Sequence, residues 1–251
     1  MKTYLINLDR RPDRLREMTE RLAALSLPFE RISAVDGKTA DLRGKVAWVR
    51  ATLYGNILPP PLGHVACFFS HRAIWQKMVD ENIPVALVLE DDVIPVAWDA
   101  AILRVELEKF GLDQLRIEKT PYPVINPFPM GKQRLEILQR IAVNEPSYGA
   151  GAYIITLSGA KKCLVLNKFY FYVDGFDMLS RVVGLKTAIL LPIMWKQSDS
   201  ASDTSPGSNS SVFVEGQNPS FGGKFGEAIA LSLKRLVGLL PGYRPMMSAG
   251  E

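Results

Sequence analysis

Residues 84–92 read PVALVLEDD, and this stretch decides the fold. Its first six residues are apolar without a break, which is typical of a β-strand that is buried on both faces. Strands of this kind belong to open α/β sheets, in which ligands bind beyond the carboxyl ends of the strands. The apolar run ends abruptly in Glu90, Asp91 and Asp92. The sequence therefore predicts a buried strand that delivers three consecutive carboxylates to a cleft.

Strand and helix patterns alternate on both sides of this stretch. Residues 3–8 and 29–35 predict two strands, and apolar residues at helical spacing over residues 12–25 predict a helix between them. This strand–helix–strand order is typical of a parallel sheet. Residues 65–82 predict an amphipathic helix before the central strand, and residues 149–156 predict a glycine-led strand after it. We expect an α/β fold with a mostly parallel central sheet flanked by helices.

Composition and length set the expected domain organisation. With 251 residues, 47% of them hydrophobic and 22% charged, the chain is long and apolar enough to form a core, which excludes global disorder. We expect a folded domain over residues 1–197, a Ser/Gly-rich loop or linker over residues 198–223, and a C-terminal helix and tail over residues 224–251. The polar, charged start of the chain is unlike a signal peptide, which predicts a cytoplasmic protein.

The positive charge of the chain is concentrated at its N-terminus. Of the 30 Lys and Arg and the 26 Asp and Glu, 11 and 7 fall within residues 1–50, which leaves 19 of each in the rest. This excess has two readings, a solvated helix face or attraction of an anionic ligand. A net charge of +4 without interleaved basic and aromatic residues does not indicate nucleic-acid binding.

Three adjacent carboxylates after an apolar strand call for a neutralising partner. Like charges repel one another, and loss of water worsens the repulsion unless a positive charge lies close by. A divalent cation would supply that charge, and an oxygen-rich site suits Mg²⁺ or Mn²⁺. Such a cation can in turn bind a diphosphate. The alternative is a solvated turn in which the acids cap a helix.

Histidines and later aspartates supply further candidates. His64 and His71 lie two helical turns apart, about 11 Å, which is too far for both to bind one ion. His71 is either a hydrogen-bonding group beside the acidic cluster or a structural histidine. Asp174 and Asp177 are candidate general bases, with helix or turn capping as the alternative. The two cysteines do not form a C-x-x-C motif, so thiol chemistry has little support.

Four segments occur in the order found in one enzyme family. They read YLINLDRRPDRL (4–15), ISAVDG (32–37), LGHVACFFSHRAIWQKMVDENIPVALVLEDDV (62–93) and GAYIITLSGAKKCL (151–164). Over residues 1–195 the chain resembles glycosyltransferase family 25. That family comprises galactosyl- and glucosyltransferases of lipopolysaccharide and lipooligosaccharide, and it is related to collagen galactosyltransferases. The segment over residues 63–93 is the most specific.

The resemblance implies a GT-A-like fold, a single nucleotide-binding α/β domain with an acidic D-x-D-like motif. Here the motif reads Glu90-Asp91-Asp92, with glutamate at its first position. By similarity, Asp92 would be the principal ligand of Mn²⁺ (or Mg²⁺), and Glu90 would face the ribose or the metal. The folded domain over residues 1–197 would then be the catalytic domain.

The resemblance also implies roles for residues along the chain. Those expected to meet the sugar-nucleotide donor are Asn7, Arg10, Arg14, Asp36, Ser70, His71, Glu90 and Asp91. The family's β-linked products imply inversion of an α-linked donor, which requires a base for the acceptor hydroxyl. Asp174 is the first choice, because it lies in the segment that resembles the family's late aspartate motif, and Asp177 is the second. Gly175 departs from the bulkier residue of the family.

The expected function is transfer of galactose or glucose from a UDP-sugar to a saccharide acceptor in bacterial lipopolysaccharide or lipooligosaccharide assembly. Two alternatives stay open, a non-catalytic sugar-nucleotide or carbohydrate-binding relative and a Mg²⁺-binding receiver-type signalling domain. A receiver domain is about half this length and carries its acids after the first strand. Residues 225–240 predict an amphipathic helix that either packs on the core or rests on the inner face of the cytoplasmic membrane.

Overall fold

The computed structural model describes residues 1–46, 61–100, 107, 111–118, 141–143, 149–170, 172–174, 179, 182–190 and 193–198. Its helices within these residues are α1 (Pro12–Ala24), α3 (Leu62–Asp80) and α5 (Leu157–Cys163). Its strands are β1 (Lys2–Asn7), β2 (Glu30–Ser33), β3 (Val85–Glu90), β4 (Val93–Pro95), β5 (Gln114–Arg116), β6 (Ile141–Val143), β7 (Ala152–Thr156), β8 (Thr187–Leu190) and β9 (Trp195–Gln197). Apart from its first residue, Ser198, the expected linker (198–223) lies outside the described residues, as does the expected C-terminal helix and tail (224–251).

Seven strands form one mixed sheet in the order β2-β1-β3-β7-β5-β8-β6, and β4 pairs with β9 in a small second sheet. Strands β2, β1, β3, β5 and β8 run in one direction, whereas β7 and β6 run in the opposite direction. The predicted α/β class, with a mostly parallel sheet between helices, is therefore confirmed. The sequence analysis did not predict the antiparallel direction of β7.

Strand β3 lies in the interior of the sheet, between β1 and β7. Its residues 86–89 are fully buried, which confirms the prediction made from their unbroken apolar character. Ala86 and Val88 belong to the hydrophobic cluster on one face, and Leu87 and Leu89 belong to the cluster on the other. Because successive side chains of a strand point to opposite faces, both faces of β3 need apolar residues.

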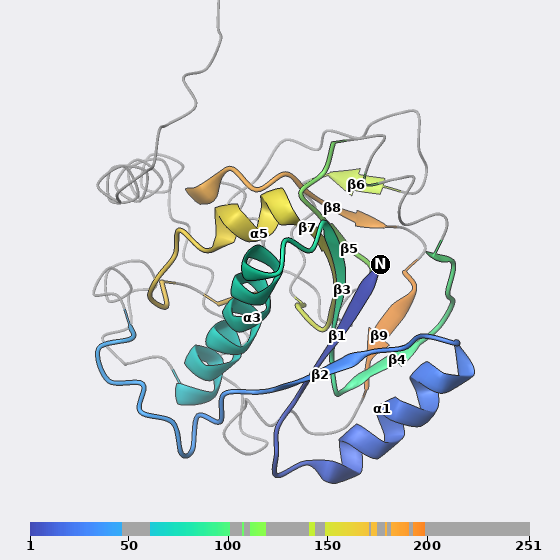
Figure 1. The fold of residues 1–251 in the computed structure, drawn as a ribbon, viewed down its shortest axis with the longest axis horizontal. Helices are drawn as coiled ribbons and strands as arrows, with labels where there is room; N and C mark the ends of the chain where they lie inside the picture. The colour runs from blue at the N-terminus through green and yellow to red at the C-terminus, as the bar shows by residue number, and fades with distance from the viewer. Residues whose placement is uncertain are drawn as a thin grey trace, which may run out of the picture.

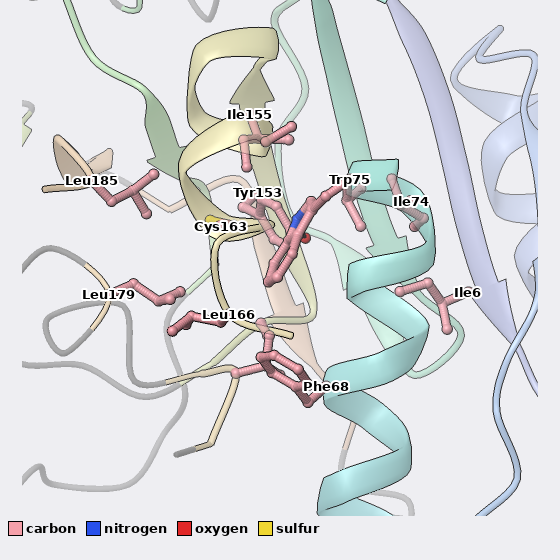
Figure 2. Packing of buried hydrophobic residues seen from close by; sticks show 14 of the residues in the cluster. Ile6, Phe68, Ile74, Trp75, Tyr153, Ile155, Cys163, Leu166, Leu179 and Leu185 are labelled. Carbon is pink, nitrogen blue, oxygen red and sulfur yellow. Dashed lines mark hydrogen bonds between the residues drawn. The ribbon is translucent and has the colours of Figure 1, made fainter. Parts of the chain in front are cut away.

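Helices cover both faces of the sheet. Figure 1 shows α3 and α5 on one side of the strands and α1 on the other. On the α3 and α5 side, Phe68, Trp75 and Tyr153 are among the largest fully buried side chains, and they pack together at the centre of Figure 2. On the α1 side, Met18 and Leu22 pack against the leucines of β3. No helix among the described residues has the length and apolar character that crossing a membrane requires.

The topology brings several strand ends to one edge of the sheet. Strands β1, β3 and β5 run in the same direction, so their carboxyl ends share this edge. The antiparallel strand β7 starts there, and Gly151 O accepts a hydrogen bond from Glu90 N at 2.8 Å. Asn7 at the end of β1 and Glu90 at the end of β3 therefore lie at the edge where the sequence predicts a binding cleft.

Replacement of Leu87 by alanine tests the two-sided burial of β3. Leu87 is fully buried, so Leu87→Ala should lower the free energy of unfolding by about 2–5 kcal/mol through lost burial and a residual cavity. Urea denaturation followed by circular dichroism measures this change. Leu62→Ala is the matched control, because Leu62 is 55% exposed and should change stability little. Equal effects of the two variants would contradict the placement of β3.

Candidate active site

The acidic turn after β3 is buried and tied to the N-terminal part of the chain. Asp91 is 9% exposed and Asp92 is 7% exposed. Asp91 accepts hydrogen bonds from Asn7 Nδ2 at 2.7 Å and from Arg14 Nη1 at 3.1 Å. Burial raises the pKa of Asp91, although these two donors act against that effect. The turn is therefore fixed by the end of β1 and by α1.

Asn7 connects three segments through its amide group. Its Nδ2 donates to Asp91 and to the backbone oxygen of Arg11 at 3.0 Å, and its Oδ1 accepts from Arg31 Nε at 2.9 Å. Both amide hydrogens of Nδ2 are engaged by these bonds. The structure thus gives Asn7 a positioning role toward Asp91, and its expected contact with a donor stays a prediction.

Asp92 has an oxygen that suits a cation. Its Oδ2 lies 3.4 Å from Gln197 Nε2 and 3.9 Å from Arg14 Nη1. Its Oδ1 is buried and has no hydrogen-bond partner in the described part of the chain. Burial and the charge of Glu90 raise the pKa of Asp92 to about 7. A buried carboxylate oxygen without a donor is costly unless a cation or a proton meets it, so this residue fits the expected metal site.

A buried hydrogen-bond chain leads from the core to Glu90. Trp75 Nε1 donates to the Tyr153 hydroxyl at 3.1 Å, that hydroxyl lies 2.9 Å from His71 Nδ1, and His71 Nε2 lies 2.8 Å from Glu90 Oε1. A carboxylate only accepts, so His71 carries its proton on Nε2. In the neutral ring, Nδ1 then accepts from Tyr153. The chain fixes the tautomer of His71 and the orientation of Glu90.

This hydrogen-bond chain keeps Glu90 ionised. Burial is the largest single effect and opposes its charge, but the hydrogen bond and charge of His71, together with the hydrogen bond from Cys67 and the charge of Arg14, hold the pKa of Glu90 below its usual value. Cys67 Sγ also lies 3.5 Å from Glu90 Oε1. Burial and the charge of Glu90 raise the pKa of the Cys67 thiol well above its usual value. Cys67 is therefore a protonated neighbour of Glu90 rather than a nucleophile.

Two sets of donor atoms surround Glu90. Cys67, His71 and Glu90 each offer a ligand atom, and these atoms all lie within 4.8 Å of one another. A set with sulfur and nitrogen suits Zn²⁺, whereas the carboxylates of Glu90 and Asp92 suit Mn²⁺ or Mg²⁺. The sequence analysis missed Cys67, although its spacing of four residues from His71 places both on one face of a helix.

The other predicted donor-binding residues lie near the same edge. Arg10 Nε donates to Asp36 Oδ2 at 2.8 Å, which joins the loops that follow β1 and β2. A backbone hydrogen bond from Lys38 and the Arg10 guanidinium hold the pKa of Asp36 below its usual range. Ser70 Oγ accepts from Val35 N at 2.9 Å. Ser70 thus ties α3 to the loop after β2.

The candidate bases are placed in part. Asp174 is half-buried, and its charge contributes to the raised pKa of Cys67. Asp177 lies outside the described residues. The role of Asp174 in proton transfer stays a prediction.

The N-terminal arginines are engaged in ion pairs with local acids. Arg11 pairs with Asp13, Arg31 with Asp9 and Arg43 with Asp41. Arg14 instead reaches Asp91. Arg11, Arg31 and Arg43 are thus paired one to one with nearby acids, and Arg14 brings a positive charge to the acidic turn.

Comparisons with known proteins identify relatives of the chain. The family described as glycosyltransferase family 25 (LPS biosynthesis protein) matches residues 1–176. A glycosyltransferase 25 family member of Aedes aegypti is 35% identical over 178 residues, which are 64% of this chain and 27% of the relative. Procollagen galactosyltransferase 1-B of Xenopus laevis is 29% identical over 178 residues, 65% of this chain and 28% of the relative. The match spans little more than a quarter of these relatives.

Another relative and one solved structure extend this comparison. A probable inactive glycosyltransferase 25 family member 3 of Bos taurus is 28% identical over 178 residues, 65% of this chain and 28% of the relative. The structure of a glycosyltransferase involved in the glycosylation of the major capsid of PBCV-1 superimposes with a TM-score of 0.45 at 9% identity. This superposition covers 80% of this chain and 94% of the other.

Removal of the Tyr153 hydroxyl tests the buried hydrogen-bond chain that runs from Trp75 to Glu90. Tyr153→Phe leaves the Trp75 indole and His71 Nδ1 without their shared partner, which should lower the free energy of unfolding by about 1–3 kcal/mol. Tyr4→Phe is the control, because the Tyr4 hydroxyl is buried and has no hydrogen-bond partner among the described residues. Tyr4→Phe should be neutral or stabilising in urea denaturation. An equal decrease in the free energy of unfolding in both variants would show that the hydrogen-bond chain makes no specific contribution to stability.

Proposed function

The chain belongs to glycosyltransferase family 25, and from this premise we propose that it transfers galactose or glucose from a UDP-sugar to a hydroxyl group of a saccharide. The observation that carries the proposal is the acidic turn at the carboxyl edge of the sheet, in which Asp91 and Asp92 are buried and Glu90 is half-buried. In open α/β sheets this edge is where nucleotide ligands bind. Family membership also removes the receiver-type alternative.

The N-terminal loops would position the nucleotide. Arg10 and Asp36 join the loops after β1 and β2 at the same edge as the acidic turn, and their paired side chains are 32% and 19% exposed. Arg10 is therefore within reach of solvent and of a bound phosphate. Asn7 and Arg14 act through Asp91, which they hold in place. These residues orient the donor by fixing the surface on which it lies.

The acidic turn would hold a divalent cation through Asp92 and Glu90. Asp92 Oδ1 is buried and lacks a hydrogen-bond donor among the described residues, which fits a cation ligand. When bound, a divalent cation stabilises the negative charge that develops on the departing diphosphate. The oxygen donors of this turn favour Mn²⁺ or Mg²⁺ over Zn²⁺. His71 keeps Glu90 ionised and oriented for this role.

Asp174 would act as the general base of an inverting displacement. It accepts the proton of the acceptor hydroxyl while that oxygen bonds to the anomeric carbon and the bond to the diphosphate breaks. The support for this role is that its segment resembles the family's late aspartate motif and that its charge acts on Cys67, which contacts Glu90. Asp177 is the second candidate.

A non-catalytic sugar-nucleotide-binding protein is the second candidate function. The relative of Bos taurus that is described as probably inactive favours it. The complete acidic turn and the hydrogen-bond chain that orients Glu90 favour catalysis instead. The acceptor that we propose is a lipopolysaccharide or lipooligosaccharide saccharide. A cytoplasmic location and membrane contact through residues 225–240 stay predictions from the sequence.

Turnover of UDP-sugars tests the proposed function. Purified full-length protein should release UDP from UDP-galactose or UDP-glucose when Mn²⁺ and a saccharide acceptor are present, and EDTA should stop the release. A coupled assay for UDP measures turnover, and mass spectrometry of the acceptor confirms transfer. Binding of a UDP-sugar without turnover under any divalent cation and acceptor would favour the non-catalytic alternative. Neither binding nor turnover would refute the transferase proposal.

Asp174→Asn tests the base. Loss of the proton acceptor should reduce kcat by about a hundredfold or more, while donor affinity stays close to that of the wild type. Steady-state kinetics with isothermal titration of the UDP-sugar separates the two quantities. Asp80→Asn is the control, because Asp80 is exposed at the end of α3. Unchanged kcat in Asp174→Asn would transfer the role to Asp177 or to another group.

A further inference from the structure

A second strand end brings another carboxylate to the acidic turn. Asp92 lies two residues beyond the end of β3, and Glu118 lies two residues beyond the end of β5. Both strands pair antiparallel with β7, one on each side of it, so they run in the same direction and end at the same edge. The pairing therefore places Glu118 level with Glu90 on the other side of the start of β7, and Asp92 follows Glu90 by two residues.

The Glu118 carboxylate is buried with one oxygen bonded and one without a partner. The residue is 1% exposed, and its Oε2 accepts a hydrogen bond from Ala152 N at 3.0 Å. Its Oε1 is buried and has no hydrogen-bond partner among the residues that the structure describes. Gly151 makes room for this group, because a Cβ atom at that position would lie 2.8 Å from Glu118 Oε2. The carboxylate thus occupies space that any other residue at position 151 would fill.

The contacts of Gly151 place Glu118 beside the acidic turn, because a Cβ atom at position 151 would lie 2.6 Å from Val93 Cγ1, next to Asp92, and 2.8 Å from Glu118 Oε2. Burial, followed by the charges of Glu90 and Asp92, raises the pKa of Glu118 to about 8. The Arg14 guanidinium contacts the turn, with Nη1 3.1 Å from Asp91 and 3.9 Å from Asp92. Four carboxylates therefore gather at one edge of the sheet. Buried like charges in excess of their partners are strongly unfavourable without further neutralisation.

Two of these carboxylates, those of Asp92 and Glu118, each have one oxygen that lacks a hydrogen-bond donor among the described residues. Asp92 Oδ1 and Glu118 Oε1 are both buried acceptors for which the described residues supply no donor. A proton neutralises one carboxylate at a time, and a water molecule adds no charge, whereas a divalent cation meets both oxygens and offsets both charges.

We propose that Glu118 is a ligand of the divalent cation that Asp92 binds, so that the cation joins the end of β5 to the end of β3. Glu118 thereby completes an oxygen-only site that excludes Cys67 and His71. The cation's part in transfer rests on the proposed function. Binding of the cation by Glu118 and Asp92 does not rest on the proposed function, and it can be tested without a sugar donor or an acceptor.

Binding of Mn²⁺ alone tests this site in full-length protein that has been treated with EDTA and dialysed. Loss of the free Mn²⁺ signal in electron paramagnetic resonance measures the affinity. Glu118→Gln keeps the shape and removes the charge, and Glu118→Asp keeps the charge but withdraws the oxygens by one methylene. Both variants and Asp92→Asn should bind Mn²⁺ at least about tenfold more weakly than the wild type, as expected for the loss of a ligand.

Two controls separate the ligand role from other causes. Asp113→Asn removes a buried carboxylate that lies away from the acidic turn, where Lys162 Nζ pairs with it at a distance of 2.6 Å. Cys67→Ser removes the sulfur of the alternative ligand set, Cys67, His71 and Glu90. Both should bind Mn²⁺ like the wild type, and circular dichroism should show all variants folded.

Each remaining outcome contradicts the proposal. Wild-type affinity in Glu118→Gln would show that Glu118 is no ligand, and wild-type affinity in Glu118→Asp would reduce its role to charge. Weaker binding in Cys67→Ser would assign the cation to Cys67, His71 and Glu90. Absence of Mn²⁺ binding to the wild type would refute the cation site itself. The transferase proposal would still be judged by UDP release.

Discussion

Burial of negative charge at the end of β3 is the constraint on which the rest of this site depends. A strand that is apolar on both faces carries its last residues into a region with little water, so the carboxylates that follow lose their solvation. Each nearby polar group offsets part of this cost. Asn7 and Arg14 hold Asp91, and His71 holds Glu90. Asp92 is the member of the turn that these groups satisfy least.

The hydrogen-bond chain behind Glu90 links the hydrophobic core to this constraint. Trp75 and Tyr153 are buried in the cluster between α3 and the sheet. The Trp75 indole is hydrogen-bonded to the Tyr153 hydroxyl, which is in turn hydrogen-bonded to His71. An indole N–H can only donate and a carboxylate can only accept, so the bonds at the two ends have a fixed direction, and in the neutral ring of His71 the Tyr153 hydroxyl donates to Nδ1. The packing that stabilises the fold therefore also sets the orientation and charge of a site residue.

Apolar runs and helical spacing within single segments predicted the strands and helices that depend on their own sequence. The unbroken apolar run predicted β3, and the acids that follow it predicted the turn that we assign as the candidate site. The direction of β7 and the position of Glu118 depend on pairing between distant segments, which a single sequence does not specify. Residues 113–147 offered only short strands and turns, so Glu118 carried no local signal. Cys67 was visible as a helical neighbour of His71, but its contact with Glu90 depends on how α3 packs on β3.

The reversed strand β7 explains why the site contains backbone donors as well as acids. In a wholly parallel sheet, only carboxyl ends of strands would meet at this edge, and more side chains would compete for it. Because β7 starts here, it brings a residue without a side chain, Gly151, and the backbone amide of Ala152 between β3 and β5. The Ala152 amide anchors one oxygen of Glu118, and Gly151 leaves space for the carboxylate. One antiparallel strand thus lets two parallel strands contribute carboxylates to the same edge of the sheet.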